Sequence, residues 1–237
     1  MKDAGLAVGA GMVIGAAAWW VAQKVAELRA ELAIARWRAE RDPLTGLYNR
    51  AGFAGAAQAQ LRTAGAHLVL LVDLDDFKPV NDNLGHQVGD QALTEIGHRL
   101  AAYVDGRGVA ARLGGDEFAA VISVCDAADA DATVWTVRQR LAEPMCADGF
   151  VFAVWGSVGV ARTDGVLRTE SVHTLLSRAD AAMYRAKRTG TGVAFYDPDT
   201  DAGWQNADGV RPAVRRRERL HAPVRPRPVG EVDRDAA

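Results

Sequence analysis

The stretch DLDDFKPVNDNLGHQVGD, residues 73–90, decides the fold because it ends a buried strand and opens a helix. The apolar run that leads into it, HLVLLVD at residues 67–73, is typical of a buried strand. Alternation along that strand sends the side chains of Asp73 and Asp75 to the same face of the sheet. Carboxylates gathered at a strand end, with Lys78 soon after, suit a hard cation such as Mg²⁺ that carries phosphate.

A second acidic segment, RLGGDEF at residues 112–118, is predicted to form the tip of a hairpin. Its two glycines permit the positive φ of a tight turn and let the backbone approach a ligand closely. Its two acids, Asp116 and Glu117, are costly to hold together unless a cation or water neutralises them. If this hairpin lies beside the strand that ends at Asp73, the acids can share metal ions that hold a triphosphate and activate a hydroxyl.

A third segment, SRADAAMYRAKRTG at residues 177–190, is predicted to be an amphipathic helix. Lys187 and Arg188 at its end can reach phosphates, or they can simply offset the helix dipole. Helices and strands are mixed along this region, so we expect an α+β fold with one mostly antiparallel sheet and helices packed on it. Helices are expected at 50–63, 77–84, 90–104, 128–142 and 172–188, and strands at 67–73, 109–113, 117–123, 150–161 and 193–196.

The N-terminal segment AGLAVGAGMVIGAAAWWVA, residues 4–22, carries no charge and is just long enough to span a bilayer. We therefore expect a single-pass membrane-anchor helix at residues 1–23. A cleaved signal peptide and a marginal surface helix are the alternatives. Lys and Arg are more frequent after the segment than before it, which predicts a location at the inner membrane with the rest of the chain in the cytoplasm.

The next segment, residues 24–41, is predicted to be a coiled-coil linker helix. Apolar residues alternate spacings of four and three there, which indicates a seam that pairs two chains in parallel, or else an ordinary amphipathic helix. The seam consists of Val21, Val25, Leu28, Leu32 and Ala35. The C-terminal tail at 201–237 is rich in Arg and Pro without an apolar period, so we expect it to be disordered.

Composition excludes several classes of protein. Hydrophobic residues make up 49% of the 237 residues and charged residues 24%, which is the balance of a globular protein. The net charge of -2 argues against a polybasic nucleic-acid binder, so no specific nucleic acid is expected. Two cysteines are too few for a disulfide scaffold or a Cys-based zinc cluster.

These segments resemble the GGDEF family, the diguanylate cyclases. The signature Gly-Gly-Asp-Glu-Phe is intact at residues 114–118, and residues 73–90 follow the family pattern D-x-D-x-F-K-x-x-N-D…G-H-x-x-G-D. The resemblance runs in order from about Asp42 to Tyr196. Further motifs similar to those of the family are DPLTGLYNR at 42–50, SVGVA at 157–161 and the segment 179–187.

The resemblance implies a palm-like α+β domain over residues 42–200. It implies that two GTP molecules become cyclic di-GMP and two pyrophosphates, with two Mg²⁺ per active site, or Mn²⁺ in their place. Two domains of a homodimer would face each other, and each 3′-hydroxyl would attack the α-phosphate of the other GTP. A GTP-binding regulatory domain without turnover and a purely structural dimerisation unit are the alternatives.

The resemblance also assigns site residues. It assigns metal binding to Asp73, the carbonyl of Leu74, Asp116 and Glu117. It assigns catalysis to Asp116 and Glu117. It assigns binding of the guanine base to Asn81 and Asp90. It assigns binding of the phosphates to Phe77, Lys78 and Lys187. The chain departs from the family pattern at Thr191, where the family has an Arg. Either Arg188 compensates for this change or the affinity for the triphosphate is weaker.

Overall fold

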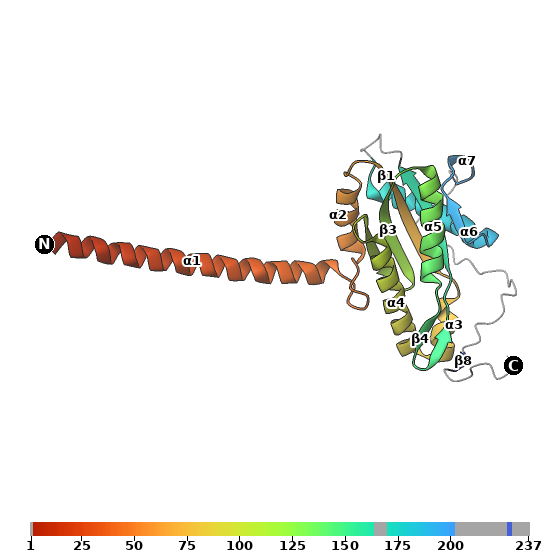
Figure 1. Ribbon diagram of the computed structural model, residues 1–237, viewed down its shortest axis with the longest axis horizontal. Coiled ribbons are helices and arrows are strands. Elements are labelled where there is room, and N and C mark those ends of the chain that lie inside the picture. The colour runs from red at the N-terminus through yellow and green to blue at the C-terminus, as the bar shows by residue number, and fades with distance from the viewer. Residues whose placement is uncertain (1, 164–169, 202–226, 229–237) are drawn as a thin grey trace, which may run out of the picture. The chain divides into compact units, whose positions relative to one another are not determined.

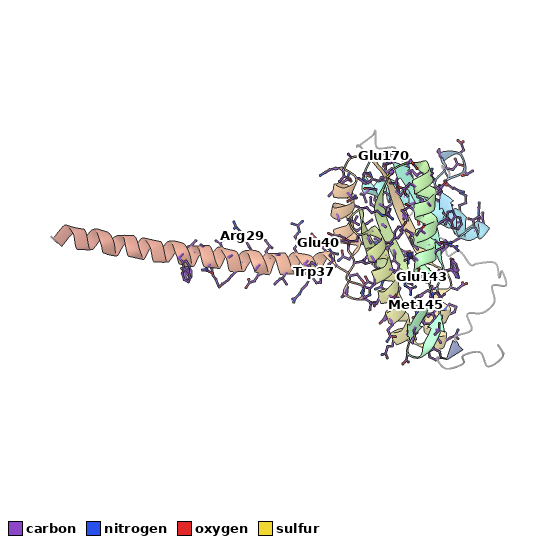
Figure 2. The ribbon with its side chains drawn as sticks, viewed as in Figure 1. Arg29, Trp37, Glu40, Glu143, Met145 and Glu170 are labelled. Atoms are coloured by element: carbon purple, nitrogen blue, oxygen red, sulfur yellow. The ribbon has the colours of Figure 1, made fainter. Side chains whose placement is uncertain are left out.

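The computed structural model describes residues 2–163, 170–201 and 227–228 of the chain. It divides into two compact units, Met1–Glu40 and Arg41–Ala237. The first unit is a single helix, α1 (Lys2–Glu40), which covers both N-terminal segments that the sequence separates. Side chains such as Arg29 and Trp37 project outward from this helix (Figure 2).

The membrane anchor expected at residues 1–23 is not supported. Within the described residues, no helix combines the length and the apolar character needed to cross a bilayer. Residues 4–22 contain eleven Gly or Ala residues but only five Leu, Ile or Val residues, and the latter types are the ones that favour insertion. The expected location at the inner membrane, which rested on this anchor, is therefore wrong.

The second unit is built on a five-stranded sheet with the order β2-β3-β1-β6-β7. Strand β1 (Ala66–Leu74) lies at its centre, antiparallel to β3 (Glu117–Val124) and to β6 (Gly156–Thr163). On one edge β2 (Gly108–Gly114) is antiparallel to β3, and on the other β7 (Val193–Phe195) is parallel to β6. The sheet is thus mixed, with helices on both of its faces, as the predicted α+β fold requires (Figure 1).

Alternate residues of β1 divide the core between the two faces. Leu70 and Val72 pack into the cluster that includes residues of α3, α4 and α5. Val69 and Leu71 pack into the cluster that includes residues of α2 and α6. All four side chains are buried, which explains why β1 is an unbroken apolar run. The helices are α2 (Arg50–Gln60), α3 (Phe77–Leu84), α4 (His86–Val104), α5 (Ala127–Leu141), α6 (Val172–Thr189) and the short α7 (Pro198–Asp201).

Helix α6 lies very close to the sheet because β6 has a glycine at the point of contact. A Cβ atom on Gly159 would lie 2.0 Å from the carbonyl oxygen of Ala179 and 2.3 Å from the amide nitrogen of Met183. Only a residue without a side chain fits there. This contact fixes how far the basic end of α6 stands from the sheet.

A second, smaller sheet has the order β4-β5-β8. It consists of β4 (Met145–Ala147), β5 (Phe150–Phe152) and β8 (Arg227–Pro228). The single strand expected at 150–161 is therefore two strands, β5 and β6, which belong to different sheets. Most of the expected disordered tail lies outside the described residues, which include only Asp201 and residues 227–228 of it.

Candidate functional site

Two acidic segments that are far apart in the sequence meet at one end of β1. Asp73 is directly opposite Glu117 in the β1–β3 register. The amide of Leu74 donates a hydrogen bond to the carbonyl oxygen of Asp116 at 3.2 Å. Because directly opposed residues share a face, with Cβ atoms about 4.5–5.5 Å apart, the carboxylates of Asp73 and Glu117 lie on the same side of the sheet. The hairpin thus lies beside the strand that ends at Asp73, which is the condition for a shared ion.

Cations from the two helices of that face contact these acids. The ammonium group of Lys187, near the end of α6, forms an ion pair with Asp73. The guanidinium of Arg50, the first residue of α2, lies 3.6 Å from the carboxylate of Glu117. The site therefore holds carboxylates and basic groups side by side, as a site for a metal-bound phosphate ester requires.

The donor set fits a hard divalent cation. Asp73 and Glu117 offer carboxylate oxygens, and the backbone of Leu74 adjoins that of Asp116. In the described part of the chain, no three His, Cys, Asp or Glu side chains are grouped so as to hold a metal ion by themselves. An ion bound here would thus need further oxygen ligands, such as phosphate oxygens or water.

The turn after β1 leads into the N-terminus of α3, whose first amides can donate hydrogen bonds to an anion. Asp76 adopts a left-handed conformation with φ of 52°, and its side chain does not cap the helix. The first amides of a helix have no partner within the helix, so those at Phe77 and Lys78 are available for phosphate oxygens. Phe77 is buried in the core while Lys78 is exposed, which fixes the turn and leaves the ammonium group in solvent.

The two residues assigned to the guanine base come from neighbouring helices. Asn81 lies on α3 and Asp90 on α4. A Cβ atom on Gly89 would lie 1.9 Å from Oδ1 of Asn81, so the Asn81 amide packs where residue 89 has no side chain. Gly89 therefore lets the Asn81 side chain lie against the first turns of α4, close in sequence to the exposed Asp90.

Position 191 carries no charge. Thr191 is exposed, and its hydroxyl donates to the carbonyl oxygen of Val193 at 3.1 Å. Arg188 is also exposed, one residue before the end of α6. The hydroxyl of Thr191 is thus used within the turn that leads to β7.

The structure adds an ion pair that sequence reasoning missed. Nε of Arg112 donates to the carbonyl oxygen of Gly115 at 2.9 Å, and its Nη1 lies 3.2 Å from the carboxylate of Asp42. Burial acts to raise the pKa of Asp42, but hydrogen bonds from Thr45 and Arg112 outweigh it, so the pKa is lowered. Asp42 begins the motif at 42–50 and Arg112 begins the motif at 112–118. No local sequence pattern predicts a contact between two residues that are 70 positions apart.

Comparison with known proteins identifies the class. The family described as "Diguanylate cyclase, GGDEF domain" matches residues 39–192. The chain belongs to this family. It is 44% identical over 149 residues to an uncharacterized 19.3 kDa protein of Streptomyces ambofaciens, in a match that covers 63% of this chain and 79% of the relative.

Relatives with assigned activities are longer proteins. The chain is 36% identical over 168 residues to the bifunctional diguanylate cyclase/cyclic di-GMP phosphodiesterase MucR of Pseudomonas aeruginosa, covering 69% of this chain but 24% of MucR. It is 36% identical over 173 residues to the diguanylate cyclase TpbB of the same species, covering 70% of this chain and 39% of TpbB. The chain therefore spans well under half of either relative.

Solved structures show the same fold. The coiled coil and GGDEF domain of DgcB from Caulobacter crescentus, in complex with c-di-GMP, matches with a TM-score of 0.64 and 29% identity over 73% of this chain and 93% of that one. The GGDEF domain of TpbB from Pseudomonas aeruginosa matches with a TM-score of 0.60 and 33% identity over 68% of this chain and 96% of that one. The fold is thus the GGDEF type.

Proposed function

We propose that this protein is a diguanylate cyclase, which condenses two GTP molecules into cyclic di-GMP and releases two pyrophosphates. The observation that carries the proposal is the meeting of Asp73 and Leu74 with Asp116 and Glu117 across the β1–β3 pair. Membership of the GGDEF family and the similarity to TpbB support it.

Divalent metal would be held by the acidic end of β1 and the hairpin. Asp73, the carbonyl of Leu74, Asp116 and Glu117 would be the ligands. Mg²⁺ ions bound there, two in each site or Mn²⁺ in their place, would neutralise the triphosphate and make the 3′-hydroxyl easier to deprotonate. Family members generally use a divalent metal, and the oxygen donors of this chain fit one.

The remaining residues would bind and orient the nucleotide. The amides that open α3, at Phe77 and Lys78, would bind phosphate oxygens together with the ammonium of Lys187, which already lies against Asp73. Asn81 and Asp90 would read the guanine edge, since an amide and a carboxylate complement its donors and its acceptor. These contacts would place the α-phosphate at the acidic end of β1. Asp116 would then accept the proton of the attacking hydroxyl.

Turnover would require two copies of the chain, because each site supplies one GTP and its hydroxyl must reach the other nucleotide. Helix α1 offers the means of pairing. Along its seam Leu28 and Leu32 are 56% and 69% exposed, which is costly for a helix that remains single in water. Pairing of two α1 helices would bury this seam and raise the local concentration of the partner domain.

A GTP-binding regulatory role without turnover is the second candidate. It is favoured by the uncharged Thr191, whose hydroxyl is already bonded to Val193. Such a domain would bind GTP but release no product.

The deciding experiment incubates the full chain with GTP and Mg²⁺ and quantifies cyclic di-GMP and pyrophosphate. Asp116→Asn keeps the shape of the residue but removes its charge, so product formation should fall by about 100-fold or more. Asp131→Asn is the matched control, because Asp131 is an exposed carboxylate on α5 that pairs with Arg162, outside the site. Its rate should equal that of the parent.

Two outcomes would contradict the cyclase proposal. If the folded parent protein makes no product but binds a non-hydrolysable GTP analogue in calorimetry, the regulatory role is correct. If it neither turns over nor binds the analogue, the domain is a dimerisation unit only.

A further inference from the structure

The turn between β1 and α3 has an uncommon backbone conformation. Asp76 has a left-handed backbone, which a residue with a side chain adopts only at an energetic cost. Its side chain makes no capping hydrogen bond to α3 within the described structure. The conformation of this turn directs the amides of Phe77 and Lys78. Whatever holds the turn therefore determines where those amides point.

Strand β6 supplies the first support, through Asp75. The amide of Asp75 donates to the carbonyl oxygen of Trp155 at 2.7 Å. The hydroxyl of Ser157 donates to Oδ1 of Asp75 at 2.8 Å. Ser157 is only 3% exposed and lies opposite Asp73 in the β1–β6 register. The Asp75 carboxylate is thus bonded to a buried hydroxyl immediately beside the acidic end of β1.

Helix α5 supplies the second support, through Arg138. Its Nε donates to the carbonyl oxygen of Gly156 at 3.0 Å, and its guanidinium carbon lies 4.7 Å from the centre of the Trp155 ring. Burial lowers the pKa of Arg138, and the negative charge of Asp75 acts in the opposite direction. The two groups therefore stabilise each other's charged forms.

Arg138 packs against the backbone before β7. A Cβ atom on Gly192 would lie 2.5 Å from the guanidinium carbon of Arg138. Gly192 has a φ of 76°, so glycine meets both a conformational and a spatial requirement there. The amide of Val158 donates to the carbonyl oxygen of Gly192 at 2.9 Å, which ties the same backbone to β6.

We propose that Asp75 is a positioning residue for the triphosphate: held by Ser157 and backed by Arg138, it fixes the β1–α3 turn and thereby aims the amides of Phe77 and Lys78. The proposal rests on the proposed function of the site. Asp75 acts through the backbone of the turn and is a ligand of neither metal nor nucleotide. Loss of its support should weaken the binding of GTP more than it slows the reaction of bound GTP.

The test compares three variants of the full chain in steady-state kinetics with GTP and Mg²⁺. Ser157→Ala removes the hydroxyl bonded to Asp75, and Asp75→Asn removes the charge that faces Arg138. Ser123→Ala is the matched control, because Ser123 is a β3 serine opposite His67, six residues along β1 from Asp73. Six residues of strand correspond to about 20 Å. Circular dichroism and thermal melting establish that each variant is folded.

We expect KM for GTP to rise about tenfold in Ser157→Ala and Asp75→Asn while kcat changes less than about threefold. Ser123→Ala should match the parent in both constants. Calorimetry with a non-hydrolysable GTP analogue should show the same tenfold loss of affinity without turnover. If Asp75→Asn does not fold, Ser157→Ala alone decides the question.

The proposal is wrong if both variants fold and keep the parent KM and the parent affinity for the analogue. It is also wrong if kcat falls while KM stays constant, since Asp75 would then act on the reaction itself. A parent protein that binds the analogue but makes no product refutes the cyclase activity, while the affinities of the variants still test the role of Asp75. A parent that neither binds nor reacts refutes both.

Discussion

At the scale of single residues, we expect position 191 to influence the affinity for GTP. The resemblance to the family pattern predicts an arginine where this chain has Thr191, an exposed residue in the turn between α6 and β7. An arginine binds phosphate through two parallel charge-assisted hydrogen bonds, whereas a threonine offers one neutral hydroxyl. That hydroxyl is already bonded to Val193. Lys187 of α6, which forms an ion pair with Asp73, therefore supplies a positive charge to the site.

Introducing the missing charge should improve binding. Thr191→Arg is expected to lower KM for GTP by about tenfold, the effect of one additional charge-assisted contact, with little change in kcat. Thr189→Arg is the control, since it adds the same charge two residues earlier on an exposed part of α6. Equal effects in the two variants would mean that general electrostatic attraction, and not position 191, controls affinity.

At the scale of elements, the contact between β6 and α6 carries much of the site's geometry. Helix α6 holds Lys187 against Asp73, and the helix can approach β6 only because Gly159 has no side chain. A methyl group at position 159 would clash with backbone atoms of α6, which cannot move out of the way by a change of rotamer as a side chain can. The helix would have to move away from the sheet.

Gly159→Ala is therefore expected to destabilise the protein by about 1–3 kcal/mol, or roughly 3–10 °C in melting temperature. Gly55→Ala is the control, because Gly55 lies on α2 and a Cβ atom there has no neighbour within 4 Å. Alanine favours helix over glycine, so this second change should leave the melting temperature equal or higher. A Gly159→Ala protein as stable as its parent would show that α6 is not held at this point.

Elements with a strong local signal could be predicted from the sequence. The bounds of α3 match the prediction at 77–84, and β2 and β3 flank the two glycines as expected. The three-residue strand β4 was missed because so short a segment has no measurable period. The strand expected at 150–161 is divided because residues 150–152 pair with β4, whereas the ladder to β1 begins where the carbonyl of Trp155 accepts a hydrogen bond from Asp75. No pattern within one segment reveals a partner 80 residues away.

The candidate site was predictable to the same extent. The acids of the two motifs were expected to meet, and the β1–β3 register places Asp73 opposite Glu117. The supporting residues Arg112, Ser157 and Arg138 could not be assigned roles. Their roles depend on contacts between different elements, such as that between Arg112 and Asp42, and these contacts follow from the fold as a whole.

At the scale of the whole molecule, activity would depend on two chains meeting. Replacing Leu28 and Leu32 of α1 with Asp puts charge into the seam and should prevent pairing of the helices. We expect activity per chain to fall severalfold at low protein concentration and to recover as the concentration is raised. Sedimentation measured on the same samples should show dissociation.

Glu31→Asp and Arg29→Lys together form the control for that experiment, since both residues lie on α1 outside the seam and both changes conserve charge. An unchanged rate in the Asp variants at every concentration would mean that α1 is only a spacer. The pairing would then reside in the domain that begins at Arg41.

The place of β1 at the middle of the sheet has a consequence for hydrogen exchange. β1 is hydrogen-bonded to a neighbouring strand on each side, so its amides should exchange only when most of the domain unfolds. The edge strand β7 has only three residues and can open locally at a low free-energy cost. Local opening of the sheet is thus expected at its edge and not at its centre. The carboxylate of Asp73, at the end of the central strand, therefore keeps its alignment when the edge of the sheet opens locally.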